Sequence, residues 1–482
     1  MNKDILKQKV VSGLFWKFSE RFLSQLVSLS VSIVIARLLS PSDYGIIALV
    51  MVFITISNVL LSSGLSQAII QKKTLDEEEL SSVLFVNILL SIVLYLILYF
   101  VAPFFAEFYK LPILEIILRV LGLQLIIFSF NSIQHAYIAR HMLFRRFFWS
   151  TFFGTLISGI LGLVLAFNDF GVWALVAQNI TNSFVDTVIL FFTVKICFVV
   201  KFSLKKTSKL FSYGWKILVS SLLDTIFNQA RSLIIGKIYT QYDLAYYNQG
   251  EKYPSLIMIN IDSSISSVLF PVMSSEQDKR VCLKNMTRRA IQISSYIMWP
   301  IMIFFAVCAE PIIRLVLTEK WLPCVPYLRV FCLSYGFWPI HTANLHAINA
   351  IGRSDIFLKL EIIKKVIGLI ALFISIFISP FAIAIGILIT CILSIFVNAF
   401  PNVSLLGYNF YELFQDIIPP LIISIFVGIV VYPLSCCGFS DLQTIFIQFI
   451  LGGLLYIYIS MICKLKSFYF LLKIIKENIF RH

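Results

Sequence analysis

The chain has 482 residues, of which 59% are hydrophobic and only 13% are charged, and its formal net charge is +14. Soluble proteins carry about 25% charged and about 45–50% apolar residues. So few charges cannot cover a soluble surface of this size, which excludes a cytosolic enzyme, a nucleic-acid-binding module and a disordered protein. Nucleic acid is excluded as a partner despite the positive charge, because the basic residues lie mostly between apolar segments.

Long segments without charge predict membrane-spanning helices, each of which needs about 20 apolar residues. Tyr44–Gln71 and Leu80–Ala106 contain no charged residue, and Val366–Tyr411 continues for 46 residues without one. Pro380 and Gly386 lie near the middle of that long segment and predict two helices joined by a tight turn. Including segments with one or two internal charges, the chain is predicted to be an all-α integral membrane protein with about fourteen spans, centred near residues 27, 57, 92, 126, 158, 182, 225, 256, 299, 341, 369, 391, 427 and 452.

The basic residues predict the orientation of these spans. We expect the N-terminus to be retained as the first helix, since no small-residue cleavage site follows it. With both termini in the cytoplasm, the cytoplasmic segments hold 27 Lys and Arg residues and the opposite side holds 5. Cytoplasmic loops of membrane proteins carry an excess of basic residues. The predicted orientation is therefore N-in and C-in.

The motifs of several enzyme and pump classes are missing from the sequence. There is no phosphate-binding G-x-x-x-x-G-K-[ST] loop, no G-x-G-x-x-G after a strand and no H-E-x-x-H. The nine cysteines are scattered without a C-x-x-C pair, so neither a disulfide framework nor a zinc site is expected. Acidic residues on the extracytoplasmic side are few and dispersed. We therefore expect a transporter that is not an enzyme and that holds no metal or cofactor.

An internal repeat relates the two halves of the chain at an offset of 200 residues. Ile35–Ser40 aligns with Ile235–Thr240, and Asp43 aligns with Asp243. A second match, His135 with His346, occurs at a different offset. Spans 1–6 therefore correspond to spans 7–12, which predicts two pseudo-symmetric six-helix lobes followed by a helix pair, with boundaries at residues 1–200, 201–410 and 411–482. Transporters built from such parallel repeats bind substrate between the halves.

Two spans related by this repeat carry polar residues at steps of three and four, which places them on one helical face. Ionisable residues inside a membrane usually face a cavity or a partner, because they cost about 2.5–3.5 kcal/mol each on insertion scales. We interpret these faces as the lining of a water-filled cavity. The candidate substrate-binding residues are Lys17, Arg21, Ser28, Lys216, Asn228 and Arg231, and the candidate coupling or ion-pair residues are Glu20, Asp224 and Asp262.

Structural roles remain open for several of these residues. Lys17 and Lys216 lie near cytoplasmic helix ends and could equally extend their ammonium groups to the lipid headgroups. Glu20 could pair locally with a neighbouring base, and Asp224 could be a structural partner of Arg231. His135 and His346 lie near cytoplasmic helix ends and are interpreted as hydrogen-bonded packing residues. A cationic cavity lined by hydroxyl and amide groups suits an anionic head group with many hydroxyls, although a carboxylate or a nucleotide would also fit.

The sequence resembles the polysaccharide-export flippases of the Wzx and teichuronic-acid export type, within the superfamily that includes the multidrug extruders and the lipid II flippases. The segments that carry this resemblance are Ser12–Lys17 (SGLFWK), Ile35–Gly45 (IARLLSPSDYG), Ala68–Lys72 (AIIQK), Val268–Val272 (VLFPV) and Glu319–Trp321 (EKW). The likeness covers essentially residues 10–463, and its diffuse motifs specify the family better than the substrate.

This resemblance implies fourteen helices and transfer of an undecaprenyl-diphosphate-linked oligosaccharide from the inner to the outer leaflet of the bacterial inner membrane, for O-antigen, capsule or exopolysaccharide synthesis. It also implies dependence on cavity arginines, for which Arg21 and Arg231 are the candidates, and on an ion gradient or the membrane potential. Expected partners are the lipid-linked substrate, membrane lipids and polysaccharide polymerase or export proteins. We expect a monomer, because one chain holds both lobes. The alternative is a cation-coupled multidrug or metabolite antiporter on the same fold, which should show an acid-dominated cavity.

Overall fold

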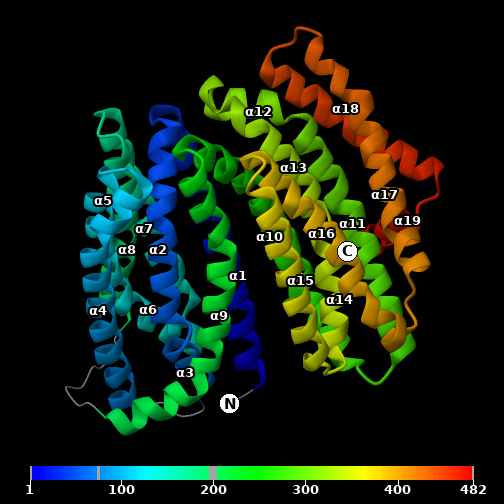
Figure 1. Cartoon of the computed structure of the whole chain (residues 1–482). Helices are drawn as coiled ribbons and strands as arrows, with labels where there is room; N and C mark the ends of the chain where they lie inside the picture. The colour runs from blue at the N-terminus through cyan, green and yellow to red at the C-terminus, as the bar shows by residue number, and fades with distance from the viewer. Residues whose placement is uncertain (1–2, 73–75, 195–202, 480–482) are drawn as a thin grey trace. The chain divides into compact units, whose positions relative to one another are not determined.

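The computed structural model describes residues 3–72, 76–194 and 203–479, and every regular element within these ranges is a helix. The all-α prediction is therefore confirmed. The chain forms two compact units that divide between Ala245 and Tyr246. The helices that begin in the first unit, drawn in blue to green in Figure 1, are α1 (Lys3–Leu38), α2 (Pro41–Ser62), α3 (Leu65–Gln71), α4 (Glu77–Tyr109), α5 (Ile113–Gly122), α6 (Gln124–His141), α7 (Phe144–Phe167), α8 (Val172–Thr193), α9 (Leu204–Ile238) and α10 (Gln241–Ser275).

Most of α10 and all later helices belong to the second unit. A short 3-10 helix, η1, connects α12 to α13, and a second one, η2, follows α17. The remaining elements are α11 (Arg280–Val307), α12 (Ala309–Leu317), η1 (Glu319–Cys324), α13 (Val325–Gly336), α14 (Trp338–Ala350), α15 (Ser354–Ser375), α16 (Pro380–Leu406), α17 (Phe410–Val431), η2 (Tyr432–Cys436), α18 (Asp441–Ile462) and α19 (Lys466–Ile479).

The helices agree with the predicted spans in position, but not all satisfy the criteria for crossing a membrane. All fourteen predicted centres lie in a helix. Within the described residues, ten segments are long and apolar enough to cross, whereas the helices around residues 27, 225, 341 and 369 are not among them. Three of these four exceptions have a simple cause. Helices α9 and α15 carry several charges, and α13 and α14 are each too short to cross. The count of fourteen stays a prediction.

The long charge-free segment divides as predicted. Helix α15 ends at Ser375 and α16 begins at Pro380, with Ser379 as its N-cap accepting a hydrogen bond from the Ala382 amide at 3.0 Å. Proline at the first helical position adds no unpaired amide and has the backbone angle that a helix needs. Gly386 lies inside α16 rather than in the turn, and a Cβ atom there would make ordinary contact with α15, 3.5 Å from the Ala371 carbonyl oxygen.

Both copies of the repeat form the same joint between two helices. Between α1 and α2, the Ser40 hydroxyl donates to Asp43 Oδ2 at 2.6 Å and the Ser40 amide donates to the same oxygen at 3.0 Å. Between α9 and α10, the hydroxyl and amide of Thr240 donate to Asp243 Oδ2 at 2.7 and 3.1 Å. The Asp43 and Asp243 amides return hydrogen bonds to the Ser40 and Thr240 hydroxyls. Such capping boxes satisfy amides that have no partner within the helix. The local alignment at an offset of 200 is therefore confirmed.

The compact units do not coincide with the lobes expected from the repeat. The first unit extends to residue 245 and includes α9, because α9 packs on α2, α3 and α4. Glycines allow this close approach: a Cβ atom on Gly214 would lie 2.3 Å from the Gly64 carbonyl oxygen, and one on Gly45 would lie 1.9 Å from that of Gln241. The lobe boundaries at residues 200 and 410 remain a prediction from the repeat.

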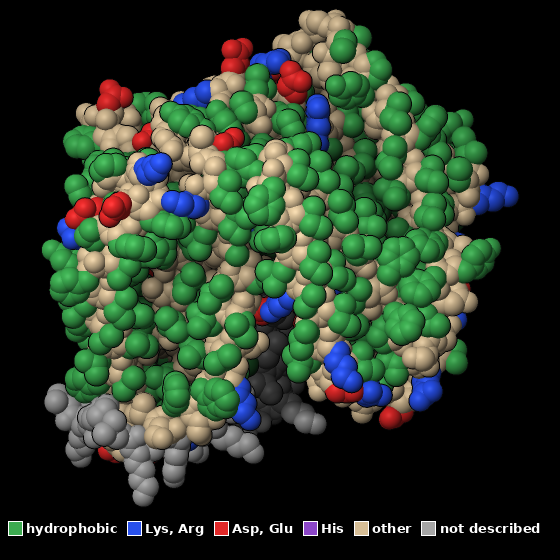
Figure 2. All heavy atoms as spheres, viewed as in Figure 1, with side chains coloured by type: hydrophobic (Ala, Val, Ile, Leu, Met, Phe, Trp, Pro, Cys, Tyr) green, Lys and Arg blue, Asp and Glu red, His purple; other side chains and the backbone are tan. Residues whose placement is uncertain are grey.

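The surface has the composition expected of a protein in a bilayer. Figure 2 shows hydrophobic side chains over the middle of the visible face, with Lys, Arg, Asp and Glu gathered towards the ends of the helices. Large side chains such as Phe100, Phe192 and Phe377 are 74–78% exposed. Soluble monomers rarely expose apolar patches of more than a few hundred Å². Lipid chains are the solvent that such a surface fits.

Candidate functional site

An exposed polar stripe runs along α9. Lys216, Ser220, Asp224 and Asn228 follow one another at four-residue steps, and all four side chains are exposed. Two buried glycines hold α9 against its neighbours, Gly214 beside Gly64 and Gly236 beside Leu49. The polar side chains between them are exposed. A lysine and an aspartate on the exposed side of a predicted span indicate contact with water or a polar ligand.

Arg231 continues the polar residues of α9 towards its C-terminal end. Its side chain is half-buried, and the guanidinium carbon lies 5.3 Å from the centre of the Phe227 ring. Within the described part of the chain no carboxylate lies within ion-pair distance of Arg231, so the structure does not bring Asp224 to it as a structural partner. The alternative of a local pair between these two residues is not supported.

The predicted stripe of α1 is only partly described. Ser28 is exposed, and Ser24 is buried with a hydroxyl that has no hydrogen-bond partner. The backbone of residues 17–21 belongs to α1, but the side chains of Lys17, Glu20 and Arg21 lie outside the described part. Their roles stay predictions.

Asp262 lies on α10 beside Thr342 and His346 of α14, both in the second unit. Its Oδ1 atom and the Nε2 atom of His346 are each buried without a hydrogen-bond partner. His346, the proposed repeat partner of His135, therefore lies near an acid. Its Nε2 atom makes no hydrogen bond among the described residues, so the interpretation of His346 as a hydrogen-bonded packing residue is not supported at that atom. Asp262 is separate from the α9 stripe in sequence and belongs to a different helix pair.

A polar cluster that the sequence analysis missed joins α6 to α8 in the first unit. His135 Nε2 lies 2.9 Å from Asp186 Oδ2, and Asn131 Nδ2 donates to the same oxygen at 2.7 Å. Gln124 Nε2 makes a further bridge between these helices, to the Ser183 hydroxyl at 2.7 Å. The available signal was Asp186 itself, the single charged residue of the Val172–Thr193 segment. The interpretation of His135 as a hydrogen-bonded residue is confirmed.

His135 and Asn131 also line a cavity of about 330 Å³ between the α2–α3 joint, α6 and α7. Most of the lining surface is apolar, although seven of its fourteen lining residues are polar: Ser62, Ser63, Ser66, Gln67, Asn131, Ser132 and His135. This volume is at the lower end of the range of about 300–1,000 Å³ typical of ligand pockets. The cavity can hold water or a hydroxylated group next to the ionisable His135–Asp186 pair.

The corresponding helix pair of the second unit is polar but carries no acid. Asn402 Nδ2 donates to Asn344 Oδ1 at 2.8 Å, and Asn398 Nδ2 lies 3.2 Å from His341 Nδ1, joining α14 to α16. All four residues are buried. In lipid there is no hydrophobic driving force between helices, and hydrogen bonds between them help to hold them together. Such bonds join the helix pairs of both units. Only the first unit places a carboxylate among them, within the described residues.

A second missed cluster clamps α11 to α17. Arg288 donates to both oxygens of Asp416, from Nε at 2.8 Å and from Nη2 at 3.0 Å, and from Nη1 to Glu412 at 3.1 Å. Gln292 and the Tyr408 hydroxyl also donate to Asp416, whose side chain is only 2% exposed. All three nitrogens of the Arg288 guanidinium therefore donate to carboxylates within the protein. This arrangement is suited to holding helices together rather than to binding a ligand.

Comparison with known sequences places this membrane protein in a family. The profile of a family described as "Polysaccharide biosynthesis protein" matches residues 34–326, more than half of the chain. The chain belongs to this polysaccharide biosynthesis protein family. The resemblance to Wzx and teichuronic-acid export proteins is thus confirmed at the level of the family.

Two relatives in this family have names that connect them with polysaccharides. The succinoglycan biosynthesis transport protein ExoT of Rhizobium meliloti is 21% identical over 333 residues, 69% of this chain and 67% of its own length. The lipopolysaccharide biosynthesis protein WzxC of Escherichia coli is 21% identical over 372 residues, 77% of this chain and 75% of its own length.

Among solved structures, the fold is similar to that of the lipid II flippase MurJ in an inward closed conformation. The TM-score is 0.74, with 93% of this chain and 98% of that chain covered, at 17% sequence identity. An identity this low establishes a shared fold and nothing about a shared ligand. The similarity supports the predicted fold class independently of the helix count.

Proposed function

We propose that this protein is a flippase that moves an undecaprenyl-diphosphate-linked oligosaccharide from the cytoplasmic to the outer leaflet of the bacterial inner membrane, without catalysing a chemical reaction. The observation that carries the proposal is the exposed stripe of α9, which places basic, amide and hydroxyl groups along one open face of a membrane helix. These groups would suit many anions. Membership in the polysaccharide biosynthesis protein family favours a precursor of a polysaccharide among them.

The residue types of the stripe match the two parts of such a head group. Lys216 and Arg231 would neutralise the diphosphate, for which arginine offers two parallel hydrogen bonds and lysine a compact charge. Asn228 and Ser220, with Ser28 of α1, would exchange hydrogen bonds with sugar hydroxyls. The lipid tail would remain in the bilayer, since only the polar head needs to avoid the hydrocarbon core. The product would then pass to polymerase and export proteins on the outer side.

The driving force in this proposal is an ion gradient or the membrane potential. One charge moving across 100 mV is worth about 2.3 kcal/mol, enough to bias a leaflet equilibrium roughly fifty-fold. Asp224 is the acid best placed to carry a coupling proton, because it lies in the middle of the exposed stripe. Glu20, on α1, is the second candidate. Equal transport by Asp224→Asn and Glu20→Gln variants would remove proton coupling through either residue.

The test is the leaflet distribution of lipid-linked glycan in cells whose own copy of the gene has been deleted. We expect glycan to accumulate on the cytoplasmic face in the deletion strain and in strains expressing Lys216→Gln or Arg231→Gln. Loss of one charged hydrogen bond to phosphate costs about 1.5–3 kcal/mol, a reduction of more than tenfold in transport at limiting substrate. Lys279→Gln is the matched control, because this lysine is 72% exposed in the α10–α11 connection and pairs with the nearby Glu276 rather than with a residue of α9.

The alternative, a cation-coupled multidrug or metabolite antiporter, makes the opposite prediction. It requires that organic cations accumulate in the deletion strain while glycan distribution stays unchanged. The described part of the α9 stripe carries two basic residues, Lys216 and Arg231, against one acid, Asp224, which disfavours a cationic substrate. Unchanged glycan distribution in every strain would reject the flippase for that glycan.

A further inference from the structure

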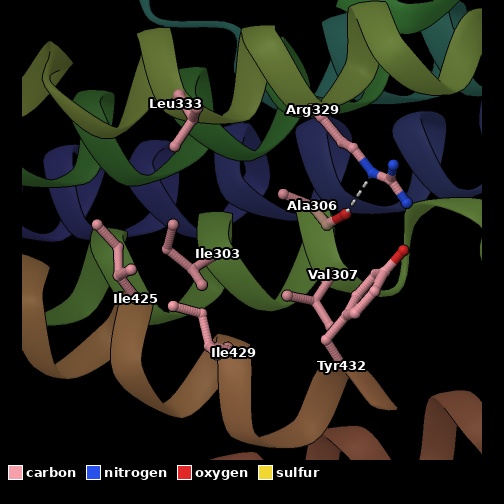
Figure 3. Close-up of a pocket in the computed structure, with 9 residues that line it drawn as sticks. Ile303, Ala306, Val307, Arg329, Leu333, Ile425, Ile429 and Tyr432 are labelled. Carbon is pink, nitrogen blue, oxygen red and sulfur yellow. Dashed lines mark hydrogen bonds between the residues drawn. The ribbon is translucent and has the colours of Figure 1, made fainter. Parts of the chain in front are cut away.

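A groove of about 520 Å³ lies in the second unit between α11, α13 and α17 (Figure 3). Its walls are apolar, formed by Ile303, Val307, Leu333, Ile425 and Ile429. Gly428 allows the close packing of α17 on α11, because a Cβ atom there would lie 2.7 Å from the Ile303 side chain. The groove is open at one side, where Ile429 is 66% exposed. Its shape and lining suit a hydrocarbon chain.

One end of the groove carries an arginine. Arg329 Nε donates to the Ala306 carbonyl oxygen at 3.3 Å, which fixes the guanidinium at the wall. Its Nη1 and Nη2 atoms have no partner among the described residues, and no carboxylate pairs with it there. Figure 3 shows the Tyr432 hydroxyl pointing towards these nitrogens. An arginine remains charged in proteins. Because no described carboxylate neutralises Arg329, this end of the groove can accept an anion.

Arg119 of the first unit makes the comparison informative. It too uses Nε to donate to a carbonyl oxygen at 3.3 Å, that of Tyr99 on the preceding long helix. However, Arg119 Nη1 pairs with Glu115 at 2.7 Å, one helical turn earlier. The residue one turn before Arg329 is Val325. Both arginines therefore make the same contact to a backbone carbonyl. The charge of Arg119 is neutralised by Glu115, whereas Arg329 keeps unbonded N–H donors among the described residues, beside an apolar groove.

We propose that this groove binds an anionic glycerophospholipid of the bilayer, with its phosphate on Arg329 and Tyr432 and one acyl chain between α11 and α17. A phosphate oxygen pair fits the two free guanidinium nitrogens, which is the arrangement that arginine favours. In the predicted orientation Arg329 lies near the extracytoplasmic ends of its helices, at the depth of the outer-leaflet headgroups. An anionic lipid balances the arginine, whereas a zwitterionic lipid brings its own ammonium group and competes less well.

The test measures lipid binding to the purified full-length protein by native mass spectrometry, after removal of endogenous lipid with detergent. Phosphatidylglycerol and phosphatidylcholine with identical chains are titrated separately. We expect at least tenfold tighter binding of phosphatidylglycerol to the wild type, and loss of at least that factor in Arg329→Gln. Arg119→Gln is the matched control and should bind within about twofold of the wild type. Ile429→Trp should weaken phosphatidylglycerol binding by filling the groove while leaving Arg329 in place.

Three results would overturn the proposal. Equal affinity of the two phospholipids would remove the role of charge, and wild-type affinity in both Arg329→Gln and Ile429→Trp would place the lipid elsewhere. Undecaprenyl phosphate displacing phosphatidylglycerol at a tenth of its concentration would assign the groove to the polyprenyl chain instead. The thermal unfolding of each variant is compared with the wild type first. If Arg329→Gln does not fold, Ile429→Trp and the comparison of phospholipids still decide the matter.

Discussion

The clamp between α11 and α17 offers a direct test of how burial changes the value of an ion pair. Arg288 holds the carboxylate of Asp416 through two hydrogen bonds at 2.8 and 3.0 Å. Replacing Arg288 with glutamine removes both bonds and the neutralising charge. Asp416 would remain in place with Tyr408 and Gln292 as its donors, and with almost no access to water.

The expected loss is about 3 kcal/mol in the free energy of unfolding. Removing one partner of a buried pair usually costs about 3–5 kcal/mol, because it leaves an uncompensated charge. The lower end applies here, since Arg288 itself is partly exposed and two neutral donors to Asp416 remain. The double variant Arg288→Gln/Asp416→Asn leaves no buried charge. It should recover about 2 kcal/mol relative to the sum of the single losses.

The assay is equilibrium unfolding of the purified protein in mixed detergent micelles, followed by intrinsic fluorescence. Arg353→Gln is the matched control, because Arg353 makes two equally short bonds, both 2.8 Å, to Asp355, and both side chains are exposed. Exposed pairs contribute little, so this variant should unfold like the wild type. If Arg288→Gln is no more destabilising than Arg353→Gln, or if the double variant shows the summed loss, the argument from burial is wrong.

Three further predictions concern packing, the polar cluster and orientation. Gly45→Val should lower the free energy of unfolding by about 3 kcal/mol or more, since the valine side chain would meet backbone at the start of α10. Gly453→Ala is its control and should leave the unfolding curve unchanged, because nothing lies within 4 Å of a Cβ atom at Gly453. Asp186→Asn should lower the free energy of unfolding by about 1–3 kcal/mol, because the donors on α6 lose a charged acceptor. If the losses from Asp186→Asn and from a His135 substitution simply add in the double variant, the two residues are not directly coupled. In single-cysteine variants of intact spheroplasts, a membrane-impermeant maleimide should label exposed Cys437, before α18, and not exposed Cys463, after it; the reverse pattern would invert the proposed N-in, C-in orientation.

Local features of this protein could be predicted from the sequence alone. The length of the charge-free segments predicts the helices, because a helix satisfies the backbone hydrogen bonds of a segment within that segment, as lipid requires. The joints after α1 and α9 are also local, since Ser40 and Asp43, or Thr240 and Asp243, lie three residues apart and close the same capping box. The polar stripe of α9 follows from helical spacing, and its side chains are exposed, whereas its role as the lining of a cavity stays a prediction.

Tertiary structure alone decided which polar residues meet. Asp186 and His135 are 51 positions apart, and Asp416 and Arg288 are 128 apart, so no helical period relates them. Helix packing determines whether an intramembrane charge is neutralised inside the protein, as in the clamp, or remains exposed on the helix surface, as Lys216 does on α9. The contrast between Arg119 and Arg329 combines both levels. The Glu115–Arg119 spacing can be read from the sequence, whereas the groove beside Arg329 exists only because α11, α13 and α17 pack together.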